Sequence, residues 1–373
     1  MTDPRIDQIW AALGTVIDPE IGRPITDLDM VESVSIDDAG TAHVMVLMTI
    51  EGCPMRSNIE KMAGDAVARG AQGISAVRVE SGTMSEEQRS RLVASLREGR
   101  REIPFNRPDS LTRVLGISSG KGGVGKSTLT ANLGAALHRL GYRVGILDAD
   151  IHGFSIPGMY GISAQPTKVN DLLMPPEAHG VKVMSIGMFV PEGQAVVWRG
   201  PKMHRAIEQF ASDVFWGDLD FLLLDLPPGT GDVAISVSQL LPGAELVVVT
   251  TPNTAASDVA LRVGSLAKST DQRIIGVIEN MSWMDLPDGS RMEVFGSGGG
   301  ERVAQALTET QGARVPLLGQ VPLEQKVREG SDEGLPTVIG DPDAAASAAI
   351  MSIAQSLAQP RGLAGRKLRL TVT

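Results

Sequence analysis

The sequence predicts an α/β protein with two parts: a large, doubly wound, mostly parallel sheet and a small N-terminal α/β domain. The chain has 373 residues, which is long for one compact domain. From Leu111 onward, short and continuously apolar runs alternate with helical patterns, as in a parallel sheet that is buried on both faces. We therefore expect domains at residues 1–84 and 111–373, joined by a charged helical connector and linker at residues 85–110.

The N-terminal domain shows a helix, a hairpin, a second helix and a last strand. Five apolar residues recur at helical spacing and predict one buried helix face: Ile6, Ile9, Trp10, Leu13 and Ile17. Apolar and polar residues then alternate on both sides of residues 37–40, which predicts a β-hairpin. Pro54 opens the second helix, and residues 74–79 form the last strand.

Residue composition and apolar runs also predict the connector and the strands of the large domain. Residues 85–101 are rich in Glu, Gln and Arg and predict a solvated helix, which the breaker-rich "IPFNRPDS" follows. The strands expected in the large domain are Val114–Ser118, Val144–Asp148, Val181–Ile186, Phe221–Asp225, Leu246–Thr250, Ile274–Ile278 and Pro316–Gln320.

Composition excludes several classes of protein. The formal net charge of −10 argues against a broad basic surface, so we expect no nucleic-acid partner. No apolar run is long enough to span a membrane, and the N-terminus lacks the pattern of a secretion signal, so we expect a cytoplasmic protein without a membrane partner. A single cysteine, Cys53, excludes an intrachain disulfide, and the five histidines show no ligand spacing.

A glycine-rich loop, "GISSGKGGVGKST" at Gly116–Thr128, lies between a predicted strand and a predicted helix. This context is typical of a P-loop, in which backbone N–H groups and the helix N-terminus hold phosphates. The glycines that allow the turn are Gly120, Gly122, Gly123 and Gly125. Lys126 is placed to reach the β- and γ-phosphates, and the Ser127 hydroxyl is placed to coordinate Mg²⁺. A second lysine, Lys121, lies inside the loop.

Carboxylates follow two other strands. Asp225 ends an apolar strand at the edge where open α/β sheets bind ligands, and there it can hold Mg²⁺ through water. The loop at residues 227–231, "PPGTG", is suited to sensing the γ-phosphate. Asp148 and Asp150 follow the second strand. Either both cap the next segment, or one of them orients the attacking water.

These residues carry a family resemblance. KGGVGKST resembles the deviant Walker A motif of MinD/ParA-type ATPases. The strings DADIHGFSIPGM, VWRGPKM, DLPPGTGD and IENMS are similar to the Mrp/ApbC branch of iron–sulfur cluster carrier ATPases. The N-terminal part, with "DPE" at residues 18–20 and "TIEGCPM", resembles the SufT/PaaD-like domain that is often fused to them. The resemblance implies slow ATP hydrolysis with Mg²⁺, a homodimer, and delivery of iron–sulfur clusters to apoproteins, with apo iron–sulfur client proteins or assembly machinery as partners.

The resemblance also assigns roles to catalytic residues. It implies that Lys121 crosses a nucleotide-sandwich dimer to the phosphates of the partner subunit, where a cation acts much as an arginine finger does. It makes Asp150 the water-orienting carboxylate and Asp225 the Mg²⁺-linked one.

The remaining nucleotide contacts come from the loop and from two later strands. Gly120 to Thr128, Val124 included, would hold the phosphates, with Thr128 at the α-phosphate. Asn280 and Pro322 would contact the adenine, although Asn280 could instead cap a turn.

The sequence departs from its relatives where they bind a cluster. Typical carriers have Cys-x-x-Cys after "NMS", and this chain has Asp285-Leu286-Pro287-Asp288, which reads as a turn. Carboxylates are poor ligands for iron–sulfur clusters. Cys53 is the remaining thiol, either an iron–sulfur ligand or a structural cysteine. Its place before a predicted helix favours a lowered thiol pKa. Asp18 and Glu20 either join it in a small site or form a turn.

Three functions compete at this stage. The first is an ATP-hydrolysing iron–sulfur carrier or assembly factor. The second is a spatial-organisation switch like MinD or ParA, which would need a C-terminal amphipathic helix to bind a membrane. The tail "GRKLRLTVT" instead alternates with period two, as a strand or a frayed end would. The third is a nucleotide-gated scaffold with negligible turnover.

Overall fold

The computed structural model describes residues 3–50, 53, 55–97, 102–150, 153–190, 200–229, 231–253 and 256–359. The C-terminal tail at residues 360–373 therefore lies outside the described residues.

The chain divides into two compact units. The first unit consists of Met1–Thr112, Ser163–Ala178 and Lys182–Leu219. The second unit consists of Arg113–Ile162, His179–Val181 and Asp220–Thr373.

The first unit contains a three-stranded sheet in the order β1-β2-β3. Its N-terminal elements are α1 (Pro4–Leu13), β1 (Val31–Ile36), β2 (Thr41–Met48), α2 (Arg56–Gly70), β3 (Ala76–Thr83), α3 (Glu86–Arg97) and the 3-10 turn η1 (Pro104–Asn106). Its later elements are β6 (Thr167–Val169), β7 (Leu172–Met174), β8 (Glu177–Ala178), most of β9 (Val181–Ser185), η2 (Ile186–Phe189) and α6 (Gly200–Ser212). β1 and β2 pair antiparallel, so the predicted hairpin is confirmed, and β2 pairs with β3 in parallel.

The core of this unit corrects two details. In α1, Ile9 and Leu13 are buried as predicted, but Trp10 is 38% exposed and Ile17 is 43% exposed. The prediction for these two residues is wrong, because the helix ends at Leu13 and Trp10 lies about 100° around the helix from Ile9. In α3, Leu92 is buried in the core, so this helix is more than a solvated connector.

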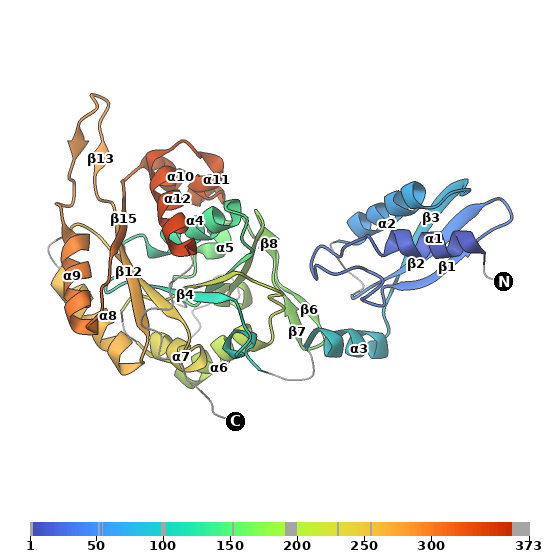
Figure 1. The fold of residues 1–373 in the computed structure, drawn as a ribbon, viewed down its shortest axis with the longest axis horizontal. Coiled ribbons are helices and arrows are strands. Elements are labelled where there is room, and N and C mark those ends of the chain that lie inside the picture. The colour runs from blue at the N-terminus through green and yellow to red at the C-terminus, as the bar shows by residue number, and fades with distance from the viewer. Residues whose placement is uncertain are drawn as a thin grey trace. The chain divides into compact units, whose positions relative to one another are not determined.

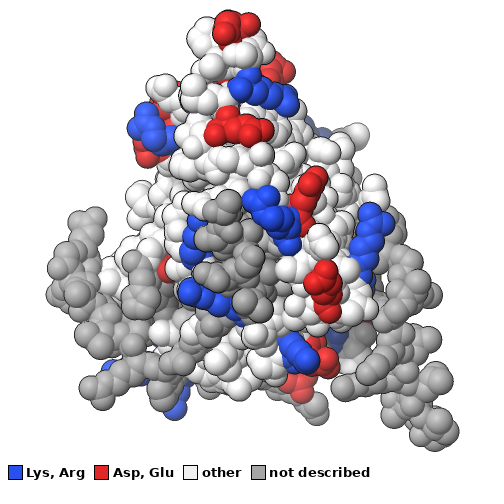
Figure 2. Space-filling view, turned by 90° about the vertical axis from the view of Figure 1, so that its left-hand side faces the viewer, with Lys and Arg blue, Asp and Glu red and all other residues white. Residues whose placement is uncertain are grey.

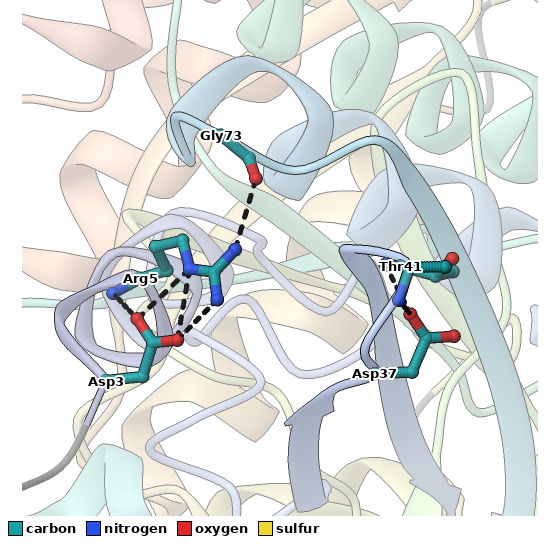
Figure 3. Close-up of polar contacts among 6 residues, drawn as sticks. Asp3, Arg5, Asp37, Thr41 and Gly73 are labelled. Atoms are coloured by element: carbon teal, nitrogen blue, oxygen red, sulfur yellow. Dashed lines mark hydrogen bonds and ion pairs between the residues drawn. The ribbon is translucent and has the colours of Figure 1, made fainter.

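Short-range polar contacts fix the first helix and the hairpin turn (Figure 3). Asp3 caps α1 by accepting a hydrogen bond from the backbone N–H of Arg5, and the two side chains also form an ion pair at 2.6 Å. Arg5 reaches on to the carbonyl of Gly73. Asp37 accepts a hydrogen bond from the N–H of Thr41 at 2.8 Å, which closes the β1–β2 turn.

The second unit is built on the large sheet (Figure 1). Its elements up to β12 are β4 (Arg113–Ser118), α4 (Lys126–Arg139), β5 (Val144–Asp148), α5 (Ile156–Met159), β10 (Phe221–Asp225), α7 (Asp232–Leu240), β11 (Glu245–Thr250), α8 (Ala256–Ser269) and β12 (Arg273–Asn280). The later elements are β13 (Met284–Asp285), β14 (Arg291–Met292), α9 (Gly299–Gln311), β15 (Leu317–Val321), α10 (Gln325–Glu333), α11 (Thr337–Gly340) and α12 (Ala345–Ala358).

The strand order of the large sheet places the P-loop. The order is β15-β12-β11-β4-β10-β5-β9-β8, and the neighbours from β15 to β5 are parallel. All seven predicted strands belong to this sheet, so the predicted doubly wound, mostly parallel fold is confirmed. After β4 the chain forms strands on one side and later on the other, which makes the carboxyl end of β4 a topological switch point. The glycine-rich loop begins there.

Two surface observations concern possible partners. None of the helices in the part of the chain that the structure describes is long and apolar enough to cross a membrane. On the face of the molecule in Figure 2, the described acidic and basic side chains are interspersed and do not gather into a patch of one sign.

Candidate nucleotide-binding site

The loop between β4 and α4 has the backbone of a phosphate cradle. Gly123 and Gly125 have φ values of +75° and +77°, a region that favours glycine. A Cβ on Gly125 would lie 2.3 Å from Nδ2 of Asn280, so no other residue fits there without movement. Helix α4 begins directly after Gly125 without a side-chain cap, which leaves its first N–H groups to a ligand.

Lys126 and Asp225 form the buried centre of the site. Nζ of Lys126 lies 2.7 Å from Oδ1 of Asp225, and the two side chains are 6% and 0% exposed. Ser127 Oγ donates to Oδ2 of Asp225 at 2.5 Å. Thr130 Oγ1 donates to Oδ1 of Asp225 at 2.8 Å. The serine hydroxyl and the carboxylate are hard oxygen ligands placed side by side, and this donor set fits Mg²⁺.

Thr130 is a site residue that sequence reasoning missed. It lies one helical turn after Lys126 and is fully buried. The signal was present, because positions i and i+4 share one face of a helix. Thr130 therefore lies on the same face of α4 as Lys126, and a polar side chain there is expected to contact Asp225 at the end of β10.

The two aspartates after β5 have different environments. Asp148 is fully buried, and its carboxylate accepts hydrogen bonds from the N–H groups of Asp150 at 3.1 Å and Ile156 at 3.4 Å. It therefore caps the following segment. Asp150 faces the phosphate site, since its Oδ2 lies 3.8 Å from Nζ of Lys126.

The loop after β10 lies against the P-loop. The N–H of Gly229 donates to the carbonyl of Ser119 at 2.8 Å, and Pro228 lies 3.9 Å from where a Cβ of Gly122 would be. Thr230 lies outside the described residues. A ligand that moves one of these loops will therefore contact or displace the other.

Asn280 and Pro322 lie at the carboxyl ends of adjacent strands, β12 and β15. Asn280 is 8% exposed, and its Nδ2 donates to the carbonyl of Val124 at 2.9 Å, so it stabilises the backbone of the P-loop. Pro322 is buried and directly follows Val321, whose carbonyl accepts a hydrogen bond from the N–H of Ser282. Contact of Asn280 and Pro322 with adenine stays a prediction.

The other loop residues differ in exposure. Gly120 and Val124 are buried, Lys121 and Thr128 are half-buried, and Gly122 and Gly123 are exposed. Lys121 forms no ion pair with the residues that the structure describes. Its ammonium group lies in the loop and is not tied to Asp225.

Comparison with known proteins identifies the family. Residues 110–358 match the NUBPL iron-transfer P-loop NTPase family, and residues 6–81 match an iron-sulfur cluster assembly protein family. The chain belongs to the iron-transfer P-loop NTPases. This confirms the resemblance that the loop and strand motifs carry.

Relatives of known name cover nearly the whole chain. It is 55% identical over 368 residues to the "Iron-sulfur cluster carrier protein" of Mycobacterium tuberculosis (strain ATCC 25618 / H37Rv), covering 98% of this chain and 96% of that one. The protein of the same name in Bacillus subtilis is 40% identical over 86% of this chain and 89% of its own. A nucleotide-binding protein of Archaeoglobus fulgidus, solved in complex with ADP, superposes with a TM-score of 0.53 at 32% identity, covering 63% of this chain and 91% of that one.

Within this iron-transfer NTPase, the segment that replaces the cysteine pair is a turn. Oδ1 of Asp288 accepts hydrogen bonds from the N–H of Ser290 at 2.9 Å and from its hydroxyl at 2.6 Å, and these bonds hold the pKa of Asp288 below its usual value. Asp285 pairs with Arg291 across the β13–β14 hairpin at 3.2 Å. Both aspartates are turn and hairpin residues, as predicted.

Cys53 lies in a small pocket of the first unit together with Asp18, Glu20 and Thr49. Asp18 is 4% exposed, and its Oδ1 accepts hydrogen bonds from the N–H groups of Glu20 and Ile21, which makes it a turn-forming residue. Burial raises the pKa of Asp18 and of Glu20. No group of three or more His, Cys, Asp or Glu side chains suited to a metal ion occurs among the described residues.

The expectation that the pKa of the Cys53 thiol is lowered is wrong. Burial raises the pKa of Cys53 above its usual value, and the charges of Glu20 and Asp18 raise it further. N–H groups of Met55 and Arg56, at the start of α2, lower it, but their effect is smaller than that of burial. The helix start therefore does not activate this thiol.

Proposed function

We propose that this chain is an ATP-hydrolysing carrier that delivers iron–sulfur clusters to apoproteins in the cytoplasm, working as a nucleotide-sandwich homodimer. The family assignment and the names of the relatives support the carrier role. The single observation that carries the ATPase part is the buried Lys126–Asp225 pair beside the glycine loop. A fully buried carboxylate next to a lysine and a serine hydroxyl at a helix N-terminus suits binding of a phosphate and its metal ion.

The site residues divide the chemistry of hydrolysis. The backbone of Gly120–Thr128 and the ammonium of Lys126 would hold the phosphates, and Ser127 and Asp225 would hold Mg²⁺. When bound, Mg²⁺ would neutralise the charge on the β- and γ-phosphate oxygens. Asp150, at the rim of the site, orients the attacking water.

A second subunit would complete the site. Lys121 is half-buried beside the exposed Gly122 and Gly123. Two large apolar side chains close in sequence to the site residues are also exposed: Phe154 by 42% and Ile235 by 40%. A partner subunit placed over the P-loop would bring its own Lys121 to the phosphates, where the cation stabilises transition-state charge.

The cargo site differs from that of typical carriers. Asp285 and Asp288 cannot replace the missing cysteine pair, because each is held in a hairpin contact and carboxylates suit clusters poorly. The remaining thiol is Cys53, and two subunits supply two such thiols. The same observation favours a second candidate function, a nucleotide-gated assembly scaffold that acts on cluster proteins without binding the cluster itself.

One experiment separates the two candidates. The protein is produced in iron-replete cells, purified without oxygen, and assayed for iron, sulfide and visible absorption, with Cys53→Ala as the test variant and Asp288→Ala as the control. A carrier holds cluster in the wild type and in Asp288→Ala and loses it in Cys53→Ala. Absence of a cluster in the wild type, even after anaerobic reconstitution, would refute direct carriage and leave the scaffold.

A further inference from the structure

A pocket lies between the last turns of α8 and α9, at the edge of the large sheet opposite to the phosphate loop. The two helices lie side by side along β11 and β12 (Figure 1). β12 begins at Arg273 and runs parallel to β11, which runs parallel to β4, so the pocket lies at the amino edge of these strands. Its volume is about 200 Å³. Since a cavity of roughly 150 Å³ holds one benzene molecule, this pocket has room for about eight non-hydrogen atoms.

A buried amide group in the wall of this pocket has a polar atom without a partner. Gln272 lines the pocket and is 7% exposed. Its Oε1 accepts a hydrogen bond from the hydroxyl of Thr270 at 3.2 Å, but its Nε2 is buried and has no partner among the described residues. The N–H of Gln272 donates to the carbonyl of Ala267, and Asp271 has a φ of +52°, a helix ending that usually brings an apolar residue to position 272. A buried donor here indicates an acceptor that the chain itself does not supply.

Two charged side chains of opposite sign line the same pocket. They are Lys268, in the last turn of α8, and Asp271, which follows that helix. Neither forms an ion pair with the other or with another residue in the described part of the chain. The hydroxyl of Thr310 donates to the carbonyl of Ala306 at 2.9 Å, so its lone pairs are left to accept. The pocket therefore offers a cation with an amide donor, and a carboxylate with a hydroxyl acceptor.

We propose that the α8–α9 pocket binds a small zwitterion of the size of a free amino acid. The carboxylate of the ligand accepts from Lys268 and from Nε2 of Gln272, and its ammonium group pairs with Asp271. The carbonyl ends of the two helices add partial negative charge that favours the ammonium group. A simple anion would leave Asp271 unpaired, and a simple cation would leave Lys268 unpaired. The site lies away from the phosphate loop, so the proposal is independent of ATP hydrolysis and of cluster transfer.

Titration calorimetry of the full-length protein without nucleotide tests the proposal. The probes are threonine, valine, proline and asparagine, which have about eight or nine non-hydrogen atoms each, together with their N-acetyl and carboxamide derivatives. At least one free amino acid should bind with a Kd below about 10 mM, and blocking either of its charged groups should weaken binding about tenfold or more. Absence of binding by all four would overturn the proposal. Equal binding of the N-acetyl form would also overturn it and would indicate an anion site.

Variants of the pocket place the binding at these residues. Lys268→Met and Asp271→Asn change exposed side chains, so circular dichroism should match the wild type, while the affinity for the bound amino acid should fall about tenfold or more. Gln272→Leu should weaken binding similarly and, without ligand, should be at least as stable as the wild type, because it removes an unpaired buried donor. The control is Arg273→Met, which removes a neighbouring exposed cation that does not line the pocket and should leave the affinity unchanged. Wild-type affinity in both Lys268→Met and Asp271→Asn would refute the assignment.

Discussion

The buried pair of Lys126 and Asp225 gives the most quantitative prediction. In Lys126→Met the ammonium group is removed and the side chain stays long and apolar. The carboxylate of Asp225, which is 0% exposed, then loses a cation at 2.7 Å. Because water cannot reach it, the remaining hydrogen bonds must hold this charge alone.

The expected loss of stability follows from the remaining contacts. Breaking a buried ion pair by removing one partner costs about 3–5 kcal/mol. Asp225 keeps the hydroxyl donors of Ser127 and Thr130, so we expect the lower end, about 3 kcal/mol. Asp225→Asn leaves Lys126 near Asp150 at 3.8 Å, and we expect a smaller loss of about 2 kcal/mol.

A double-mutant cycle tests this reasoning. Thermal unfolding is followed for the wild type, both single variants and the double variant, all without nucleotide. The double variant buries no charge at this position, so it should be less destabilised than the sum of the single variants by about 2 kcal/mol. Additive effects, or a Lys126→Met variant as stable as the wild type, would refute the claim that the two groups are electrostatically coupled.

Three further predictions concern single positions. Gly125→Ala should abolish ATP binding, measured by titration calorimetry, because its Cβ would lie 2.3 Å from Asn280 at a φ of +77°; wild-type affinity would show that the loop adapts. Thr130→Val should destabilise the protein by about 1–3 kcal/mol, since it removes a donor to the buried Asp225; Thr128→Val, at a half-buried position with no side-chain contact to Asp225, is the control. The alkylation rate of Cys53 should rise with pH around a midpoint above that of a free cysteine of about 8.5, because burial raises the thiol pKa and disfavours thiolate at neutral pH. A midpoint below that of a free thiol, measured from pH 6 to 10, would contradict the raised pKa.

The sheet and the phosphate loop were predictable because their signals are local. A strand such as Phe221–Asp225 is a short apolar run that ends in a carboxylate, and this pattern is typical of a buried parallel strand. The requirement for glycine at position 125 follows from loop geometry that the motif itself encodes. The position of Asp225 at the ligand-binding edge follows from the strand that precedes it.

The features that sequence reasoning missed depend on distant contacts. Residues 163–178 follow the nucleotide-site segment in the chain, and no local pattern shows that Val169 packs with Leu92. The direction of the Cys53 pKa depends on burial by several elements, whereas sequence shows only the start of α2. The exposure of Trp10 depends on which face of α1 the first unit covers.

The claim that the ATP site is shared between two subunits has a direct test in a mixing experiment. Lys121→Ala and Asp150→Ala each remove one catalytic group, and each variant alone should hydrolyse ATP about 10³-fold more slowly than the wild type. In an equimolar mixture, half of the dimers pair the two variants, and one of their two sites then has both groups. We expect recovery of about a quarter of the wild-type rate. A mixture as inactive as its components, with dimers confirmed by light scattering, would contradict catalysis by Lys121 from the partner subunit.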